Sequence, residues 1–188
     1  MHKYYKIYKP YGVLSQFVNN QNKRRNKKLL SDIYDLPPNT MAIGRLDEKS
    51  EGLLLLTTNG KFSEYIRSQS VEKEYHVMVD GIITDTHINQ LTKGIDISIN
   101  GKSYQTKPCK AHILNDICHI EERFVRDQRH GKTSWLSITI AEGKFRQVRK
   151  MTSRIGLPTL RLVRVRIGDY RLENLTSGKI EEINCPHF

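Results

Sequence analysis

Residues 42–57 read Ala42-Ile43-Gly44-Arg45-Leu46-Asp47-Glu48-Lys49-Ser50-Glu51-Gly52 and then Leu53-Leu54-Leu55-Leu56-Thr57. This pattern predicts two short buried strands, Met41 to Ile43 and Leu53 to Thr57, on either side of a polar turn. A turn between buried strands stands on a rigid scaffold, which can direct one polar group at a ligand. From the pattern alone, Asp47 fits two roles: it either hydrogen-bonds its own backbone or acts in catalysis.

Strand-like and helix-like segments are interleaved on both sides of this turn, with no Pro/Gly/Ser-rich linker and no repeat. One α+β unit is therefore predicted. The expected elements of the first half are a strand over Lys3–Lys9, a short helix over Leu29–Leu36, a helix over Lys61–Ser68 and a strand over Lys73–Val79. Those of the second half are a helix from Thr84 to about Lys93, a hairpin of Ile95–Ile99 and Lys102–Lys107, strands over Ala111–Ile120, Trp135–Ile140 and Leu160–Ile167, and a helix over Phe145–Ile155.

The helix predicted for Phe145 to Ile155 has two distinct faces. Its apolar residues, spaced three or four positions apart, predict an inner face that packs on the core. The opposite face is basic and consists of Arg146, Arg149, Lys150 and Ser153. A basic helix face is either solvated surface or a contact for an anionic ligand.

The charge of the chain indicates a partner that carries phosphates. Lys and Arg outnumber Asp and Glu by 31 to 20, which gives a formal net charge of +11. Nucleic acid is the leading candidate, and a merely soluble basic protein is the alternative. The basic run from Asn19 to Lys28 fits either a solvated loop or an RNA clamp. No apolar run long enough for a membrane span and no signal peptide is visible, so a cytoplasmic protein is expected.

The cysteines do not predict a disulfide framework or a zinc ribbon, because they are three in number and contain no C-x-x-C motif. The cluster of Cys109, His112, Cys118 and His119 is the most suggestive of a metal. Side chains alternate along a strand, so Cys109 and His112 would project from opposite faces. No metal site is therefore expected.

Several segments together resemble a known family. The run G-R-L-D at Gly44 to Asp47, followed by S-E-G-L-L-L-L-T-x-x-G at Ser50 to Gly60, is similar to the signature of the RsuA-type branch of pseudouridine synthases. Further segments resemble that branch in the same order: Lys9–Phe17, Lys73–Val77, Glu142–Met151 and Gly156–Leu162. Within the branch, L-S-Q-F, T-S-W-L, R-Q-V-R-K-M-T and I-G-D-Y-R-L-E-N-L are most similar to the ribosomal large-subunit enzymes of the E type.

The resemblance implies a pseudouridine synthase catalytic fold, with a central mixed, mainly antiparallel sheet flanked by helices and loops. It predicts a single catalytic domain over residues 1–188, built as one body or as two lobes around one cleft. Many relatives begin with a small S4-like RNA-binding domain. Here the chain enters the catalytic domain almost at once, so that domain is expected to be absent, as in the E type.

The implied reaction breaks the bond between ribose C1′ and uracil N1, turns the base and rejoins it through C5. Nothing is oxidised or hydrolysed, so neither a metal nor any other cofactor is expected. The resemblance makes Asp47 the catalytic carboxylate, which either attacks C1′ or removes the C2′ proton. Arg149 matches the basic residue that pairs with this Asp, and it would oppose the protonation that a dry pocket favours. Tyr75 matches the tyrosine that stacks on the flipped target base.

The remaining predicted site residues would contact RNA through their positive charge. They are Arg45, Lys73, Arg146, Lys150, Arg161 and Arg164. The expected activity is isomerisation of a specific uridine in large-subunit, 23S-type ribosomal RNA by a monomer. Two rivals are weighed: a non-catalytic RNA-binding or ribosome-assembly protein, and a metal-dependent nuclease using Asp47, Glu48 and Glu51. Phosphate binding gives no reason to place the acid Asp47 among basic residues, which disfavours the non-catalytic RNA-binding protein. Lys49 lies between the acids that would have to bind the metal, which disfavours the nuclease.

Overall fold

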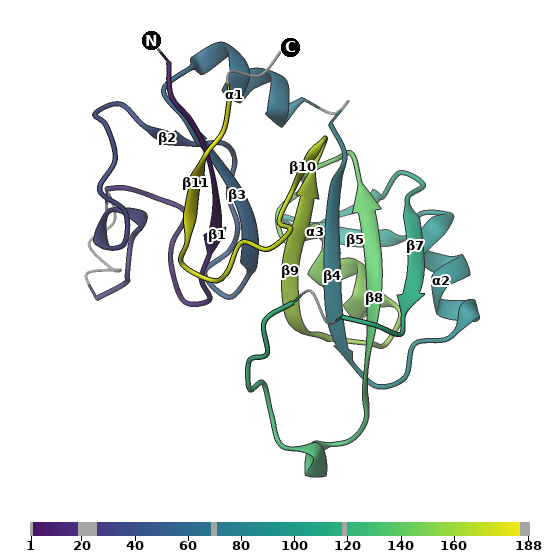
Figure 1. Ribbon diagram of the computed structural model, residues 1–188. Helices are drawn as coiled ribbons and strands as arrows, with labels where there is room; N and C mark the ends of the chain where they lie inside the picture. The colour runs from purple at the N-terminus through teal and green to yellow at the C-terminus, as the bar shows by residue number, and fades with distance from the viewer. Residues whose placement is uncertain (1, 19–25, 69–70, 118–119, 185–188) are drawn as a thin grey trace. The chain divides into compact units, whose positions relative to one another are not determined.

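The computed structural model describes residues 2–18, 26–68, 71–117 and 120–184 (Figure 1). The chain divides into two compact units: unit 1 comprises Met1–Val71 and Arg164–Phe188, and unit 2 comprises Glu72–Val163. Both units combine helices with mainly antiparallel strands, which confirms the predicted α+β class. Most of the basic run from Asn19 to Lys28 lies outside the described residues, so its predicted roles are not tested.

Unit 1 is built on the strand that follows the Asp47 turn. That strand, β3 (Glu51–Thr57), pairs antiparallel with β1 (Tyr4–Lys9) and with the short β2 (Met41–Ala42). β1 also pairs with β11 (Ile180–Glu182), so the ends of the chain share one set of strands (Figure 1). All residues of β1 and β3 are buried, which explains the unbroken apolar run Leu53–Leu56.

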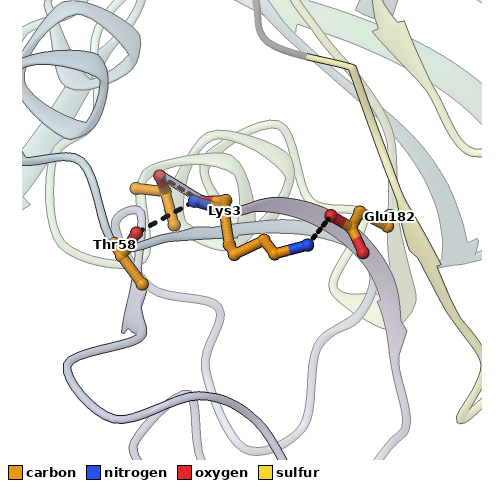
Figure 2. A network of polar contacts seen from close by, with 4 residues as sticks. Lys3, Thr58 and Glu182 are labelled. Carbon is orange, nitrogen blue, oxygen red and sulfur yellow. Dashed lines mark hydrogen bonds and ion pairs between the residues drawn. The ribbon is translucent and has the colours of Figure 1, made fainter. Parts of the chain in front are cut away.

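Polar contacts fix the start of β1. The backbone N–H of Lys3 donates to Thr58 Oγ1 at 2.9 Å, and its ammonium group pairs with the Glu182 carboxylate (Figure 2). Helix α1 (Gly60–Arg67) follows directly, with the Asn59 side chain accepting hydrogen bonds from the first turn. Its Phe62 ring packs edge-on against Tyr4, at 5.3 Å between ring centroids, and so anchors the helix on β1.

Unit 2 contains a three-stranded antiparallel arrangement in the order β4, β8, β7 (Figure 1). Its elements are β4 (Lys73–Asp80), α2 (Asp85–Thr92), β5 (Asp96–Ile99), β6 (Lys102–Gln105), β7 (Lys110–Leu114), the 3-10 turn η3 (Gln128–His130), β8 (Thr133–Ile140) and α3 (Gln147–Arg154). Strand β9 (Thr159–Ile167) begins in unit 2 and ends in unit 1, where β10 (Tyr170–Arg171) pairs with it.

The core of unit 2 lies between its strands and α3. Val77 and Val79 of β4 and Leu136 and Ile138 of β8 form one buried cluster with Met151 of α3. Strands β5 and β6 form the hairpin predicted from Asn100-Gly101, and both turn residues have the positive φ angles that this dipeptide tolerates. Because α3 turns Val148 and Met151 toward this core, its basic face points away from the core.

Three of the predicted elements are corrected. The helix expected over Leu29–Leu36 is only a single 3-10 turn, η2 (Leu30–Asp32), and the strand expected over Ala111–Ile120 ends at Leu114. The last helix begins at Gln147 because Arg146 has left-handed backbone angles. Phe145 is consequently outside the helix, and it is 64% exposed instead of facing inward.

The helices in the described part of the chain are short, and none of them is both long and apolar enough to span a membrane.

Candidate active site

The predicted site residues fall into two groups, one in each unit. Unit 1 holds Arg45, Asp47 and Arg164. Unit 2 holds Lys73, Tyr75, Arg146, Arg149, Lys150 and Arg161.

The Asp47 turn in unit 1 is braced on both sides by the segment that follows β1. Ser15 Oγ accepts a hydrogen bond from Leu46 N at 3.0 Å and donates to Leu46 O at 2.9 Å. Gly12 N donates to Glu48 O at 2.8 Å. The residues before and after Asp47 are thus both held through backbone atoms, which fixes the backbone of the turn that carries the partly buried carboxylate.

Lys9 lies buried beside this turn, at the end of β1, with 0% of its surface exposed. Its ammonium nitrogen donates to the carbonyl oxygens of Pro10 at 2.8 Å and Val13 at 2.7 Å. These two bonds hold the chain reversal from which Ser15 reaches Leu46. Lys9 therefore supports the Asp47 turn from within the core.

Several charged side chains of unit 1 lie close enough to Lys9 to shift its pKa. Burial lowers the pKa of Lys9 to about 7, because the charged form loses its hydration. Glu51 opposes this shift most strongly, and Arg164 adds to it. Asp47 also raises the Lys9 pKa, which places its carboxylate within electrostatic range of the amine.

We expect the stability of the protein to depend on pH through Lys9. Its folded-state pKa, about 7, lies below the ordinary value of 10.5, so the unfolded chain binds more protons between these two values. The free energy of unfolding should then rise with pH across this window, by at most about 1.4 kcal/mol per pH unit. Urea denaturation at several pH values should show this rise in the wild type and a weaker one in Lys9→Met. Equal pH slopes in the two proteins would contradict the prediction.

In unit 2, Tyr75 lies on the same face of β4 as the buried Val77 and Val79, since side chains alternate along a strand. It pairs with Ile138 of β8 and packs against the core cluster, but it remains partly exposed. A half-buried ring of this kind has one edge fixed by the core, and it can offer the rest of its surface to a base. Lys73, two residues earlier, shares this face.

The basic face of α3 forms one wall of an open groove of about 760 Å³. The β5–β6 hairpin forms the other wall with Asp96, Ser98, Gly101 and Ser103. Lys150 crosses between the walls, because its ammonium nitrogen donates to Ser98 O at 2.7 Å. The structure thus brings together three predicted site residues, Arg146, Arg149 and Lys150, and adds Ser153 and Arg154 to the same groove.

The comparison with known proteins settles the family. The family model described as RNA pseudouridylate synthase matches residues 3–154. The chain belongs to the RNA pseudouridylate synthase family. This confirms the family predicted from the G-R-L-D and R-Q-V-R-K-M segments, and it makes the protein an isomerase of RNA uridine.

The alignments with individual relatives of this synthase cover most of this chain and most of each relative. The ribosomal large subunit pseudouridine synthase E of Xanthomonas axonopodis pv. citri (strain 306) is 40% identical over 171 residues, which is 89% of this chain and 86% of the relative. The ribosomal large subunit pseudouridine synthase B of Bacillus subtilis (strain 168) is 32% identical over 187 residues, which is 98% of this chain and 68% of the relative. A crystal structure of a pseudouridylate synthase matches with a TM-score of 0.78 and 26% identity, and it covers 98% of this chain and 71% of that one. The predicted fold is thereby confirmed.

Two arginines of the synthase that were expected to bind RNA are almost wholly buried. Arg161 is 3% exposed, and its guanidinium lies over the Trp135 ring at 6.0 Å from the centroid. Arg164 is 5% exposed and donates from Nε to Leu53 O at 2.8 Å. Their contacts support the strands, so the prediction of phosphate contacts is better supported for the exposed Arg45 and Arg146.

Sequence reasoning gave no role to Lys9 or Ser15 of the synthase, although both lie in a segment that resembles the family. The sequence signal for Lys9 is limited to its place at the end of a predicted strand immediately before Pro10, and the burial of that strand is seen only in the structure. Ser15 offered no such signal, since a serine after a turn is common. Its role depends on a contact with Leu46, 31 residues away in the sequence.

The acids of the synthase do not form a metal site in the described part of the chain, where no group of three or more His, Cys, Asp or Glu side chains is suited to hold an ion. Glu48 accepts from Lys27 Nζ at 2.7 Å, and Glu51 is buried. This disfavours the nuclease hypothesis based on Asp47, Glu48 and Glu51. Cys118 and His119 lie outside the described residues, so the expectation of no metal in their cluster stays a prediction.

Proposed function

We propose that the protein converts a specific uridine of large-subunit, 23S-type ribosomal RNA to pseudouridine. The observation that carries this proposal is the similarity along nearly the whole chain to relatives named ribosomal large subunit pseudouridine synthase E. The net charge of +11 and the basic groove on α3 suit a substrate with a phosphate backbone. We further propose that the enzyme acts as a monomer in the cytoplasm, without a cofactor.

In this proposal Asp47 is the catalytic carboxylate. It either attacks ribose C1′ or takes the C2′ proton, and both routes cleave the bond to uracil N1. The braced turn supports this role, because a catalytic group must be held close to its productive position. The base then turns and rejoins the sugar through C5, which releases the Asp47 carboxylate or returns the proton to C2′. The C5 proton is lost to solvent and N1 takes up one proton, so the product is an isomer of the substrate.

Tyr75 and Arg149 complete the proposed catalytic set. Tyr75 would stack on the extruded uracil, since a base that leaves its helix needs a new stacking surface. Arg149 would supply the fixed positive charge that keeps the Asp47 carboxylate ionised during the reaction. The exposed or partly exposed side chains of Arg45, Lys73, Arg146 and Lys150 would contact phosphates, and Arg161 and Arg164 would contribute to the positive potential.

Two measurements test the function. Purified protein is expected to form pseudouridine in a 23S-type ribosomal RNA transcript without added metal or nucleotide. A pseudouridine map of ribosomal RNA is expected to lose one site when the gene is deleted and to regain it with the wild-type gene but not with an Asp47→Asn gene. An unchanged map, together with tight RNA binding in solution, would instead favour a non-catalytic ribosome-assembly protein.

A further inference from the structure

A buried carboxylate stands at the start of α3, where the basic wall of the groove begins. Glu142 follows β8 and is only 4% exposed. We infer that Glu142 is a positioning residue, whose carboxylate fixes the first turn of α3 and the facing hairpin so that Arg146 and Lys150 meet RNA phosphates in the groove. This inference rests on the proposed function, because it takes the groove to be an RNA contact.

Glu142 receives three hydrogen bonds from two segments of unit 2, the end of the β5–β6 hairpin and the start of α3. Tyr104 of β6 donates its hydroxyl to Oε2 at 2.6 Å, and Lys107 donates its backbone N–H to Oε1 at 2.9 Å. Gln147, the first residue of α3, donates from Nε2 to Oε1 at 2.6 Å. A buried carboxylate is costly unless such bonds compensate it, so the end of the hairpin and the start of α3 are both held to Glu142.

The contacts of Gln147 transmit this anchor to the turn that precedes α3. Its side-chain Oε1 accepts from Lys144 N at 3.1 Å, and its own N–H donates to Lys144 O at 3.1 Å. Arg146 lies inside this closed turn with φ 53° and ψ 34°, a left-handed conformation that is disfavoured for arginine. Such a conformation persists when the surrounding structure determines it, and the Glu142–Gln147 pair supplies that constraint.

The same carboxylate fixes the hairpin wall of the groove. Tyr104, which binds Glu142 through its hydroxyl, also carries the Lys144 ammonium over its ring at 4.7 Å from the centroid. The hydrogen bond to Glu142 raises the pKa of Tyr104, as expected for a phenol that donates to a carboxylate. Through this tyrosine, the hairpin and α3 share one anchor, and Lys150 bridges them at Ser98.

The direction in which one substitution changes the RNA affinity distinguishes a positioning role of Glu142 from a purely electrostatic one. Glu142→Gln keeps the size of the side chain and removes one negative charge near a basic groove. Electrostatics alone predicts tighter RNA binding. Positioning predicts weaker binding, because an amide nitrogen cannot accept the hydrogen bonds that Tyr104 or Gln147 now donates.

The experiment measures the dissociation constant of a 23S-type ribosomal RNA fragment over a salt series, with Asp47→Asn present in every protein to prevent turnover. For Glu142→Gln we expect about 10-fold weaker binding, and a slope of log affinity against log salt that is smaller by about 1, as for one lost phosphate contact. The matched control is Glu64→Gln, an exposed glutamate of α1 with the same charge change, which should bind normally. Affinity and slope equal to or greater than those of the control would overturn the inference.

A second variant keeps the test valid if Glu142→Gln does not fold. Tyr104→Phe preserves the ring beneath Lys144 and the Glu142 charge, and it removes a single hydrogen bond. It should weaken binding in the same direction by about 3-fold, with a correspondingly smaller change in slope. General destabilisation would lower the folded fraction and leave the salt slope unchanged, which would also overturn the inference. Pseudouridine formation by the wild type, measured separately, reports on the proposed function itself.

Discussion

Asp47→Asn is expected to reduce pseudouridine formation by at least about 1,000-fold, as for the loss of other catalytic nucleophiles and bases. Asparagine has nearly the same shape as aspartate but carries no charge, so it can neither attack C1′ nor accept the C2′ proton. The turn should survive, because Ser15 and Gly12 bind the backbone of Leu46 and Glu48 and not the Asp47 side chain. Release of tritium from C5-labelled uridine in the RNA measures the conversion directly.

A neighbouring acid provides the control for this substitution. Glu48→Gln removes one negative charge from the same turn and, with it, the ion pair between Glu48 and Lys27. Conversion by Glu48→Gln should stay within about 3-fold of the wild type. RNA affinity should be similar in both variants and the wild type. Conversion by Asp47→Asn above about one tenth of the wild-type rate would remove this carboxylate from the mechanism.

The sequence predicted the elements whose signals are local. The Asn100-Gly101 turn, the helix after Asn59 and the buried strand Leu53–Thr57 were all found close to their predicted places. Arg149, Lys150 and Ser153 share one face of α3, as predicted from helical periodicity, and Arg146 joins them in the groove from the residue just before the helix. The family resemblance then gave the site residues an expected role.

What the sequence could not supply depends on contacts between distant segments. The start of α3 was predicted two residues too early, because no local sequence signal indicates that Arg146 adopts a left-handed conformation. Its cause includes the Glu142–Gln147 bond and, through Tyr104, a strand 38 residues before Glu142. The burial of Arg161 and Arg164 was missed for a similar reason. Arginines in an apolar strand resemble surface residues until Trp135 and Leu53 O are known to face them.

Arg149→Met is expected to lower kcat by about 100-fold and to weaken RNA binding only by about 3-fold. The first effect follows from the proposal that Arg149 supplies the cation for the catalytic carboxylate, since losing one preorganised electrostatic partner costs about this much in other enzymes. The effect on RNA binding is small because Arg149 is only one of several positively charged side chains that line the groove. Single-turnover rates at saturating RNA, together with dissociation constants, separate the two effects.

Arg154→Met is the matched variant, because it removes the same charge from the same helix and the same groove. It should weaken RNA binding by a similar factor and leave kcat unchanged, since Arg154 has no proposed part in the chemistry. Arg149→Lys should fall between the wild type and Arg149→Met, because lysine keeps the charge and loses the planar fork that binds a carboxylate with two hydrogen bonds. If Arg149→Met and Arg154→Met both spare kcat, Arg149 contributes affinity alone, and the cation that serves Asp47 must be sought elsewhere.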